Sequence, residues 1–128
     1  SLCFQGVYGK GISNYIQDIS GSGLDLVPCA TAEGKLKAIR AWGGYIGFSH
    51  NWCKALTSNI MYSYARVLDR YGMPATSYKY AQYAAANLFW DFSEYGSCAI
   101  EYVFGRRNDF NKDYGNASRI NTMIQYRF

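Results

Sequence analysis

The chain has 128 residues, enough for one ordinary domain, and it contains no run of about 18 apolar residues that could cross a membrane as a helix. Its formal net charge of +4 is small and spread along the chain, which argues against a nucleic-acid-binding surface. The four cysteines lack the clustered spacing of a zinc site. Their wide, irregular spacing favours unpaired thiols, and a disulfide framework is the alternative.

Hydrophobic residues make up 49% of the chain and aromatic residues 18%, yet the mean hydropathy is −0.22, so apolar and polar residues must alternate finely. Alternation with a period of two predicts β-strands, because successive side chains on a strand point to opposite faces. In the clearest case Ile120, Ile124 and Phe128 share one parity, while Arg119 and Gln125 share the other. In chain order, the predicted strands lie at about 2–8, 43–50, 59–64, 83–90, 98–105 and 119–128.

The segments between these predicted strands alternate in length. Those at 12–37, 67–77 and 108–116 are long and polar, whereas those at 53–55 and 92–96 are short. Short periplasmic turns and longer extracellular loops are typical of a transmembrane, antiparallel up-and-down β-barrel of the bacterial outer membrane. A soluble β-sandwich or lipocalin-like barrel is the alternative, but it gives no reason for the alternation of loop lengths.

Aromatic residues are placed where such a barrel would meet the two membrane interfaces. An aromatic ring suits an interface because it buries an apolar body and keeps a polar edge in water. The expected girdle near the short turns contains Trp52, Trp90, Phe92 and Phe128, and the opposite one contains Tyr8, Tyr64, Tyr78, Tyr80 and Phe104.

The last five residues, Ile124-Gln-Tyr-Arg-Phe128, resemble the C-terminal signature of bacterial outer-membrane proteins. In that signature a terminal Phe follows aromatic and apolar residues at alternate positions. The barrel-assembly machinery reads this strand in the family, so the resemblance implies that machinery as a partner and the bacterial outer membrane as the location.

Five further segments carry a resemblance to a known family. They are Val7-Tyr-Gly-Lys-Gly-Ile12, Ala38-Ile-Arg-Ala-Trp-Gly-Gly-Tyr-Ile-Gly-Phe-Ser-His50, Ala86-Asn-Leu-Phe-Trp-Asp91, Glu101-Tyr-Val-Phe-Gly-Arg-Arg107 and Gly115-Asn-Ala-Ser-Arg-Ile120. Through them the chain resembles the DcaP-like porin family, whose members form trimeric porins for small, often anionic solutes. The resemblance implies a homotrimeric passive porin in which residues 1–128 are the C-terminal part of a single barrel domain. Since the smallest single-chain barrels have about eight strands, further N-terminal strands would complete it, and assembly from several copies is the alternative.

A porin performs no chemical step, so we expect no catalytic residue, metal or cofactor, and the polar strand face becomes the candidate site. That face is expected to form a net basic wall that concentrates small anions such as carboxylates. Packing of these side chains against one another or against loops is the alternative for any one of them. Strand parity assigns to the pore Lys79, Asn87, Glu101, Arg107, Arg119, Asn121, Gln125 and Arg127.

Arg40, Arg66 and Arg106 have the opposite, outward parity and lie near the long loops. An outward charge costs about 2–4 kcal/mol at mid-bilayer but only about 0–1 kcal/mol near the interface. We therefore expect these arginines to contact outer-membrane lipid, in particular the head groups of lipopolysaccharide. The alternative is a β-bulge that turns them inward.

Two other classes of function are considered. A membrane-barrel hydrolase needs a nucleophile beside a base, and by parity His50, the only histidine, is expected to have no Ser or Asp beside it on the same face. A structural or adhesive surface protein would use the loop at 13–37 as its binding part. Apolar residues that would let this loop fold inward or grip a neighbour are Tyr15, Ile16, Leu24, Leu26 and Val27.

Overall fold

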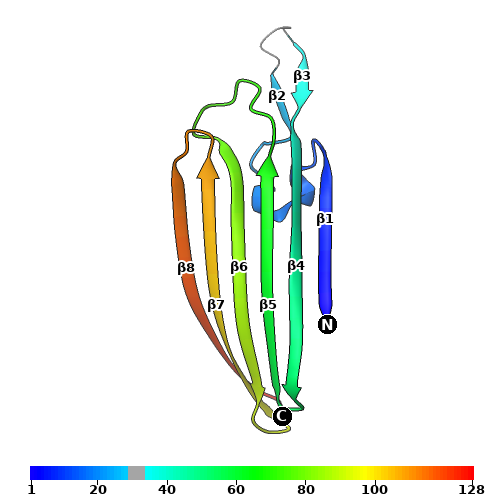
Figure 1. Ribbon diagram of the computed structural model, residues 1–128, viewed down its shortest axis with the longest axis vertical. Helices are drawn as coiled ribbons and strands as arrows, with labels where there is room; N and C mark the ends of the chain where they lie inside the picture. Colours follow the sequence, from blue (N-terminus) through cyan, green and yellow to red (C-terminus); the bar gives the residue numbers. More distant parts are fainter. Residues whose placement is uncertain (29–33) are drawn as a thin grey trace.

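The computed structural model describes residues 1–28 and 34–128, and it is an all-β structure built on one antiparallel six-stranded sheet. The strand order is β1-β4-β5-β6-β7-β8, so each strand of the sheet lies beside the next one in the chain (Figure 1). The sheet is open, with β1 and β8 at its edges. The six strands expected from the alternation are confirmed, with bounds β1 (Leu2–Lys10), β4 (Arg40–Cys53), β5 (Leu56–Val67), β6 (Tyr78–Asp91), β7 (Gly96–Asp109) and β8 (Tyr114–Tyr126).

The strand register gives the sheet two distinct faces. Outside two β-bulges, odd-numbered side chains of all six strands share one face and even-numbered ones share the other. We call the odd-numbered face the covered face, because the chain between β1 and β4 packs against part of it, and the even-numbered face the open face (Figure 1). The sheet's loop end carries the connections 11–39 and 68–77, and its turn end carries 54–55 and 92–95.

Residues 12–27, here called the infolded segment, follow β1 and fold back onto the covered face (Figure 1). They contain two short 3-10 helices, η1 (Ser13–Tyr15) and η2 (Gln17–Ile19). Asp25 fixes the segment, since its carboxylate accepts hydrogen bonds from the backbone N–H and the hydroxyl of Ser13, both at 2.7 Å. A small hairpin of β2 (Leu26–Pro28) and β3 (Leu36–Ala38) then extends past the loop end of the sheet.

The hydrophobic core lies between the infolded segment and the loop end of the covered face. Ile19 and Ile39 are fully buried there. Gly43 makes room for Ile16, because a Cβ at that glycine would lie 3.3 Å from the Ile16 side chain. The rest of the sheet is a single layer. The core residues are Ile16, Ile19, Leu24, Val27, Ile39, Ala41, Ala65, Val67, Met73 and Tyr78.

A β-bulge at the start of β6 changes the position of Tyr78. The register shifts between Tyr78 and Tyr80, so Tyr78 turns into the core, and its hydroxyl donates a 3.1 Å hydrogen bond to the carbonyl of Ala65. The expectation that Tyr78 belongs to an aromatic girdle was therefore wrong. Lys79, which the same alternation assigned to the polar face, lies in the bulge without a direct partner on β7.

The predicted long loop at 108–116 is also wrong. Strand β7 continues to Asp109 and β8 begins at Tyr114, so the connection is residues 110–113. The backbone N–H of Asp109 donates to the carbonyl of Asp113 at 2.9 Å, and Lys112 adopts a φ of 74° to close the turn. Long connections thus occur at 11–39 and 68–77 alone among the described links between the six strands.

An ion pair joins the second long connection to the start of β4. Arg40 contacts Asp69 through two guanidinium nitrogens, at 2.8 and 2.6 Å, and its backbone N–H donates to the same carboxylate at 3.0 Å. Asp69 is almost fully buried, whereas the Arg40 side chain is 43% exposed. The hydrogen bonds from Arg40 lower the pKa of Asp69 from its ordinary 3.8 to about 2.

We expect this pair to make stability fall in acid. Because the pKa of Asp69 is lowered by folding, its stabilising effect is complete above about pH 4 and is lost as the pH falls towards 2. Asp69→Asn should lower the thermal midpoint at pH 6 and flatten its decline between pH 4 and 2, as followed by circular dichroism. The matched control is Glu94→Gln in the exposed 92–95 turn, which should keep the wild-type profile. An undiminished acid decline in Asp69→Asn would contradict the assignment.

Candidate functional site on the covered face

A row of polar side chains crosses the covered face from β4 to β8. Each member lies directly opposite the next, because the registers of four successive strand pairs bring them into line. All are half-buried. We call them the polar row: Ser49, Asn59, Asn87, Glu101 and Asn121.

Cross-strand hydrogen bonds order the polar row. The amide of Asn59 donates to the side-chain oxygen of Asn87 at 2.7 Å, and the amide of Asn121 donates to the Glu101 carboxylate at 2.9 Å. Each amide keeps further donor and acceptor positions beyond these single bonds. The row can therefore offer hydrogen bonds of both kinds to water or to a polar solute without rearranging.

The charged groups of the covered face are of both signs. Arg107 and Arg119 share it with Asp91, Glu101 and Asp109, and Lys79 in the bulge of β6 makes the positive groups three against three negative. The sequence analysis did not count the two aspartates, so the strands themselves do not provide the net basic wall that it expected. Among the contacts of the described residues, Arg119 is exposed and has no ion-pair partner, and it lies one row from the polar row.

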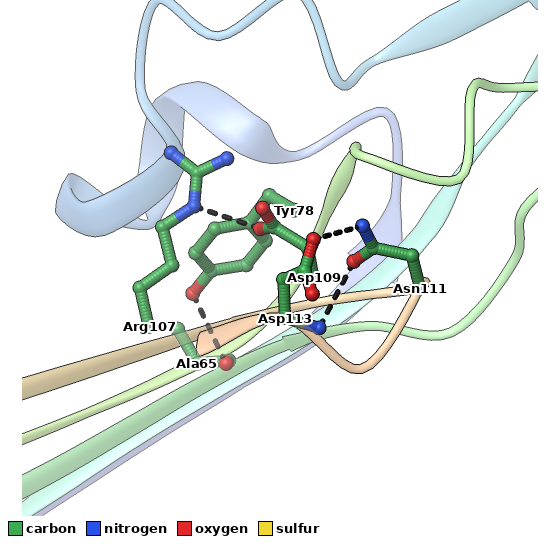
Figure 2. Close-up of polar contacts among 6 residues, drawn as sticks. All are labelled: Ala65, Tyr78, Arg107, Asp109, Asn111 and Asp113. Atoms are coloured by element: carbon green, nitrogen blue, oxygen red, sulfur yellow. Dashed lines mark hydrogen bonds and ion pairs between the residues drawn. The ribbon is translucent and has the colours of Figure 1, made fainter. Parts of the chain in front are cut away.

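At the loop end, the charges of the covered face are engaged with one another (Figure 2). The Nε of Arg107 donates to Asp109 at 2.9 Å, and the guanidinium lies 5.6 Å from the centre of the Tyr78 ring. In the adjoining turn, the side chain of Asn111 donates to Asp113 and accepts a 3.0 Å hydrogen bond from its backbone N–H. Arg107 is thus held at the rim of the sheet rather than beside the polar row.

The infolded segment and the sheet enclose two cavities. One of about 540 Å³ lies between Tyr15 and Asp18 of the segment and Tyr45 and Tyr83 of the sheet. A second, of about 410 Å³, is lined by Asp18 and Arg107 among others. Asp18 therefore borders both spaces and adds a negative group to each.

The structure brings together some of the predicted pore-lining residues and separates others. Asn87, Glu101 and Asn121 belong to the polar row, with Arg119 beside it. Gln125 lies further towards the turn end, opposite Ser97, and Arg127 follows the end of β8. Sequence reasoning missed Ser49, Asn59, Asp18 and Asp91. Strand parity puts Asn59 on the same face of its strand as Met61 and Ser63. Only the register between strands shows that it lies directly opposite Asn87.

The open face has the opposite chemistry. In the six strands every Asp and Glu lies on the covered face, so the open face carries no acidic side chain there. Two adjacent rows across its middle are almost wholly apolar and largely exposed. These apolar rows are Phe4, Ile46, Tyr62, Ala84, Phe104 and Ser118, followed by Leu2, Phe48, Ile60, Ala86, Tyr102 and Ile120.

Aromatic rings flank these apolar rows at both ends. At the loop end Trp42, Tyr64 and Tyr80 form a ladder, with ring centres 5.0 and 5.6 Å apart. At the turn end Trp90 and Phe92 are in edge contact at 5.9 Å. Trp52, Trp90, Phe92 and Phe128 are all exposed, as a girdle would require.

His50 lies on the open face and packs against Trp52, with ring centres 4.5 Å apart. Contrary to the sequence analysis, a serine does share its face, since Ser58 lies directly opposite on β5. The Ser58 hydroxyl, however, accepts a 3.0 Å hydrogen bond from the Trp52 indole. The arrangement is an aromatic cluster at the turn end.

Cys3, Cys53 and Cys98 carry free thiols, and Cys29 lies outside the described residues. Within residues 1–28 and 34–128, no three His, Cys, Asp or Glu side chains gather as a metal site would need. Nor does this part of the chain contain a helix long and apolar enough to cross a membrane.

Docking of the infolded segment should depend on Ile19. Replacing this fully buried side chain by Ala leaves a cavity, and comparable substitutions cost about 2–5 kcal/mol. We expect Ile19→Ala to expose residues 12–27 to limited proteolysis while the sheet stays intact by circular dichroism. Asn14→Ala, at an exposed position of the same segment, is the control. Equal protease resistance in both variants would show that Ile19 does not anchor the segment.

Comparisons of the chain with protein-family models, with curated proteins and with solved structures give no match.

Proposed function

We propose that this sheet is part of the wall of a passive outer-membrane porin for small hydrophilic solutes. The observation that carries the proposal is the difference in polarity between the two faces of the sheet. The open face suits lipid, because its apolar rows are exposed and no Asp or Glu of the strands lies on it. The covered face suits water, because a continuous polar row crosses it. Lipid-facing and lumen-facing residues alternate in this way along every strand of such barrels.

The height of the open face supports the proposal. From Trp42 near the loop end to Trp52 at the turn end, β4 advances ten residues, or about 34 Å at a rise of ~3.4 Å per residue. With a tilt of about 45°, this distance projects to roughly 24 Å, close to the ~25 Å apolar band of outer-membrane barrels. The two aromatic zones then lie at the two interfaces.

Closure of the pore requires additional strands at β1 and β8. The unpaired backbone groups of these edges are not tolerated in hydrocarbon, where each unsatisfied group costs several kcal/mol. The strands could come from further polypeptide of the same protein or from other copies of the chain. A trimer of complete barrels, as in the DcaP-like porins, is the arrangement we propose.

In this porin the infolded segment stands inside the lumen and narrows it. Solutes pass between Tyr15 and Asp18 on the segment and the rest of the wall, then meet the polar row. Arg107 is paired and Glu101 is hydrogen-bonded, so among the described strand residues Arg119 is the exposed positive charge beside the polar row. Arg119 is therefore the residue on which we base a preference for small anions such as carboxylates.

A structural or adhesive surface protein is the second candidate, and one observation favours it. The β2–β3 hairpin projects beyond the sheet and exposes Leu26 and Leu36. Two exposed leucines at a hairpin are a suitable contact for a protein surface. The remaining apolar residues named for this role, Ile16, Leu24 and Val27, are instead buried against the sheet, whereas Tyr15 is exposed.

Planar-bilayer recording tests the pore and its preference together. We expect the purified protein to form stable open channels whose reversal potential in a salt gradient indicates anion preference. A unit charge about 4 Å from an ion changes its energy by about 1 kcal/mol in water, or up to about 5-fold in permeability ratio. Arg119→Gln should reduce the anion preference by up to that factor, and Glu101→Gln should increase it.

The matched control is Arg106→Gln, which removes the same charge from the open face and should leave the reversal potential unchanged. Clear cation selectivity of the wild type would overturn the proposed preference, and absence of any conductance after confirmed insertion would overturn the pore. Liposome swelling with sugars and dicarboxylates separates a pore from an adhesin, because only a pore admits the solute.

A further inference from the structure

The positive charges of the open face all lie at one end. Lys10, Arg40, Arg66 and Arg106 occupy its loop end, and its strand positions towards the turn end carry no Lys or Arg. No acidic side chain of the strands shares this face to neutralise them. The Arg40 charge is compensated by Asp69 from the neighbouring connection. Arg66 and Arg106 therefore form the centre of the uncompensated positive zone.

Arg66 is surrounded by aromatic side chains. It lies directly opposite Trp42 on one side and Tyr80 on the other. Among the described residues its Nε is buried without a hydrogen-bond partner, and no ion pair involves its guanidinium. A guanidinium held in this way presents its outer nitrogens to a ligand with little loss of freedom.

Arg106 repeats this arrangement two strands away. Its guanidinium lies 4.5 Å from the centre of the Tyr114 ring, and its Nε is likewise buried without a partner. Gln82 of β6 lies directly opposite Arg106, and Tyr80 lies directly opposite Arg66. Neighbouring strands are about 4.8 Å apart, and the two arginines are offset by two residues, or about 7 Å, along the strands. Their backbones are therefore roughly 12 Å apart across β6, a gap that two arginine side chains can span from both sides.

We propose that Arg66 and Arg106, with Gln82 between them, bind the phosphate of a lipid head group, as carried by lipopolysaccharide. Planar guanidinium groups match phosphate oxygens with paired hydrogen bonds. The apolar rows begin directly beside this zone, at Tyr62, Ala84 and Phe104, and provide the surface for the acyl chains of the same molecule. This inference rests on the proposed membrane embedding of the open face.

The surroundings favour a lipid over a free anion. Arg66 and Arg106 lie on the open face of the sheet, with aromatic residues beside them and apolar rows on one side only. A soluble phosphate would gain two guanidinium contacts in competition with water. A lipid phosphate is brought to the same height on the strands by its own chains, and the partners Trp42, Tyr80 and Tyr114 suit an interface.

The experiment measures lipid retention by native mass spectrometry of the protein with the strands that close its barrel, released from proteoliposomes that contain either diphosphorylated lipid A or its dephosphorylated form. Insertion is verified first by flotation and protease protection. We expect the wild type to retain the phosphorylated lipid selectively. The double variant Arg66→Gln/Arg106→Gln should lose at least about tenfold of that retention, because charge-assisted hydrogen bonds are removed.

The matched control is Arg119→Gln/Arg127→Gln, which removes two arginines of the opposite parity and should retain the lipid within about twofold of wild type. Equal loss in both double variants, or no loss in either, would overturn the inference. Displacement of the lipid by millimolar inorganic phosphate would assign the zone to a free anion and overturn it as well. A wild type that fails to insert contradicts the proposed function itself, whereas one that inserts without retaining lipid contradicts only this inference.

Discussion

Register between neighbouring strands is the constraint on which both faces of the sheet depend. A slip of one residue in a strand pair would move every side chain of that strand to the other face. Here five successive pairings keep odd and even positions in phase, so Asn59, Asn87 and Glu101 align on one side while Ile60, Ala86 and Tyr102 align on the other. Short connections help to hold this phase, since 54–55, 92–95 and 110–113 leave the chain little freedom between strands.

The hydrophobic core covers only one end of the sheet, so it cannot by itself maintain the register of all six strands. Hydrophobic burial is concentrated at the loop end, where Ile19 of the infolded segment and Ile39 are fully buried. The remaining sheet is one layer thick, and residues such as Ile60 and Ile120 are more than half exposed on the open face. A water-soluble sheet would bury this face against a second layer. In lipid the same face needs no cover, which is why the single layer and the membrane proposal belong together.

The sequence was sufficient for strands that obey the alternation and insufficient where side chains or turns modify it. Residues 119–128 reveal their two faces without any knowledge of neighbours. Tyr78 was misplaced because a bulge reverses its side, and no residue type marks that bulge in advance. The segment 108–116 looked like a loop because it is rich in Asn, Asp and Lys, although only 110–113 lie outside the strands β7 and β8. The polar row could be predicted only from the strand register. That register depends on the exact lengths of the turns, which composition does not give.

Sequence alone is also insufficient to show which charged side chains are neutralised by partners. Parity correctly separated Arg66 and Arg106 from Arg107 and Arg119, because it depends only on numbering within a strand. It could not tell which charges are neutralised, since the partner of Arg40 is Asp69, 29 residues away on another connection. Net charge therefore says little about what either face attracts. In the proposed porin the unpaired guanidiniums decide what each face attracts: Arg119 lies beside the polar row, on the face proposed for solutes, and Arg66 and Arg106 lie on the face proposed for lipid.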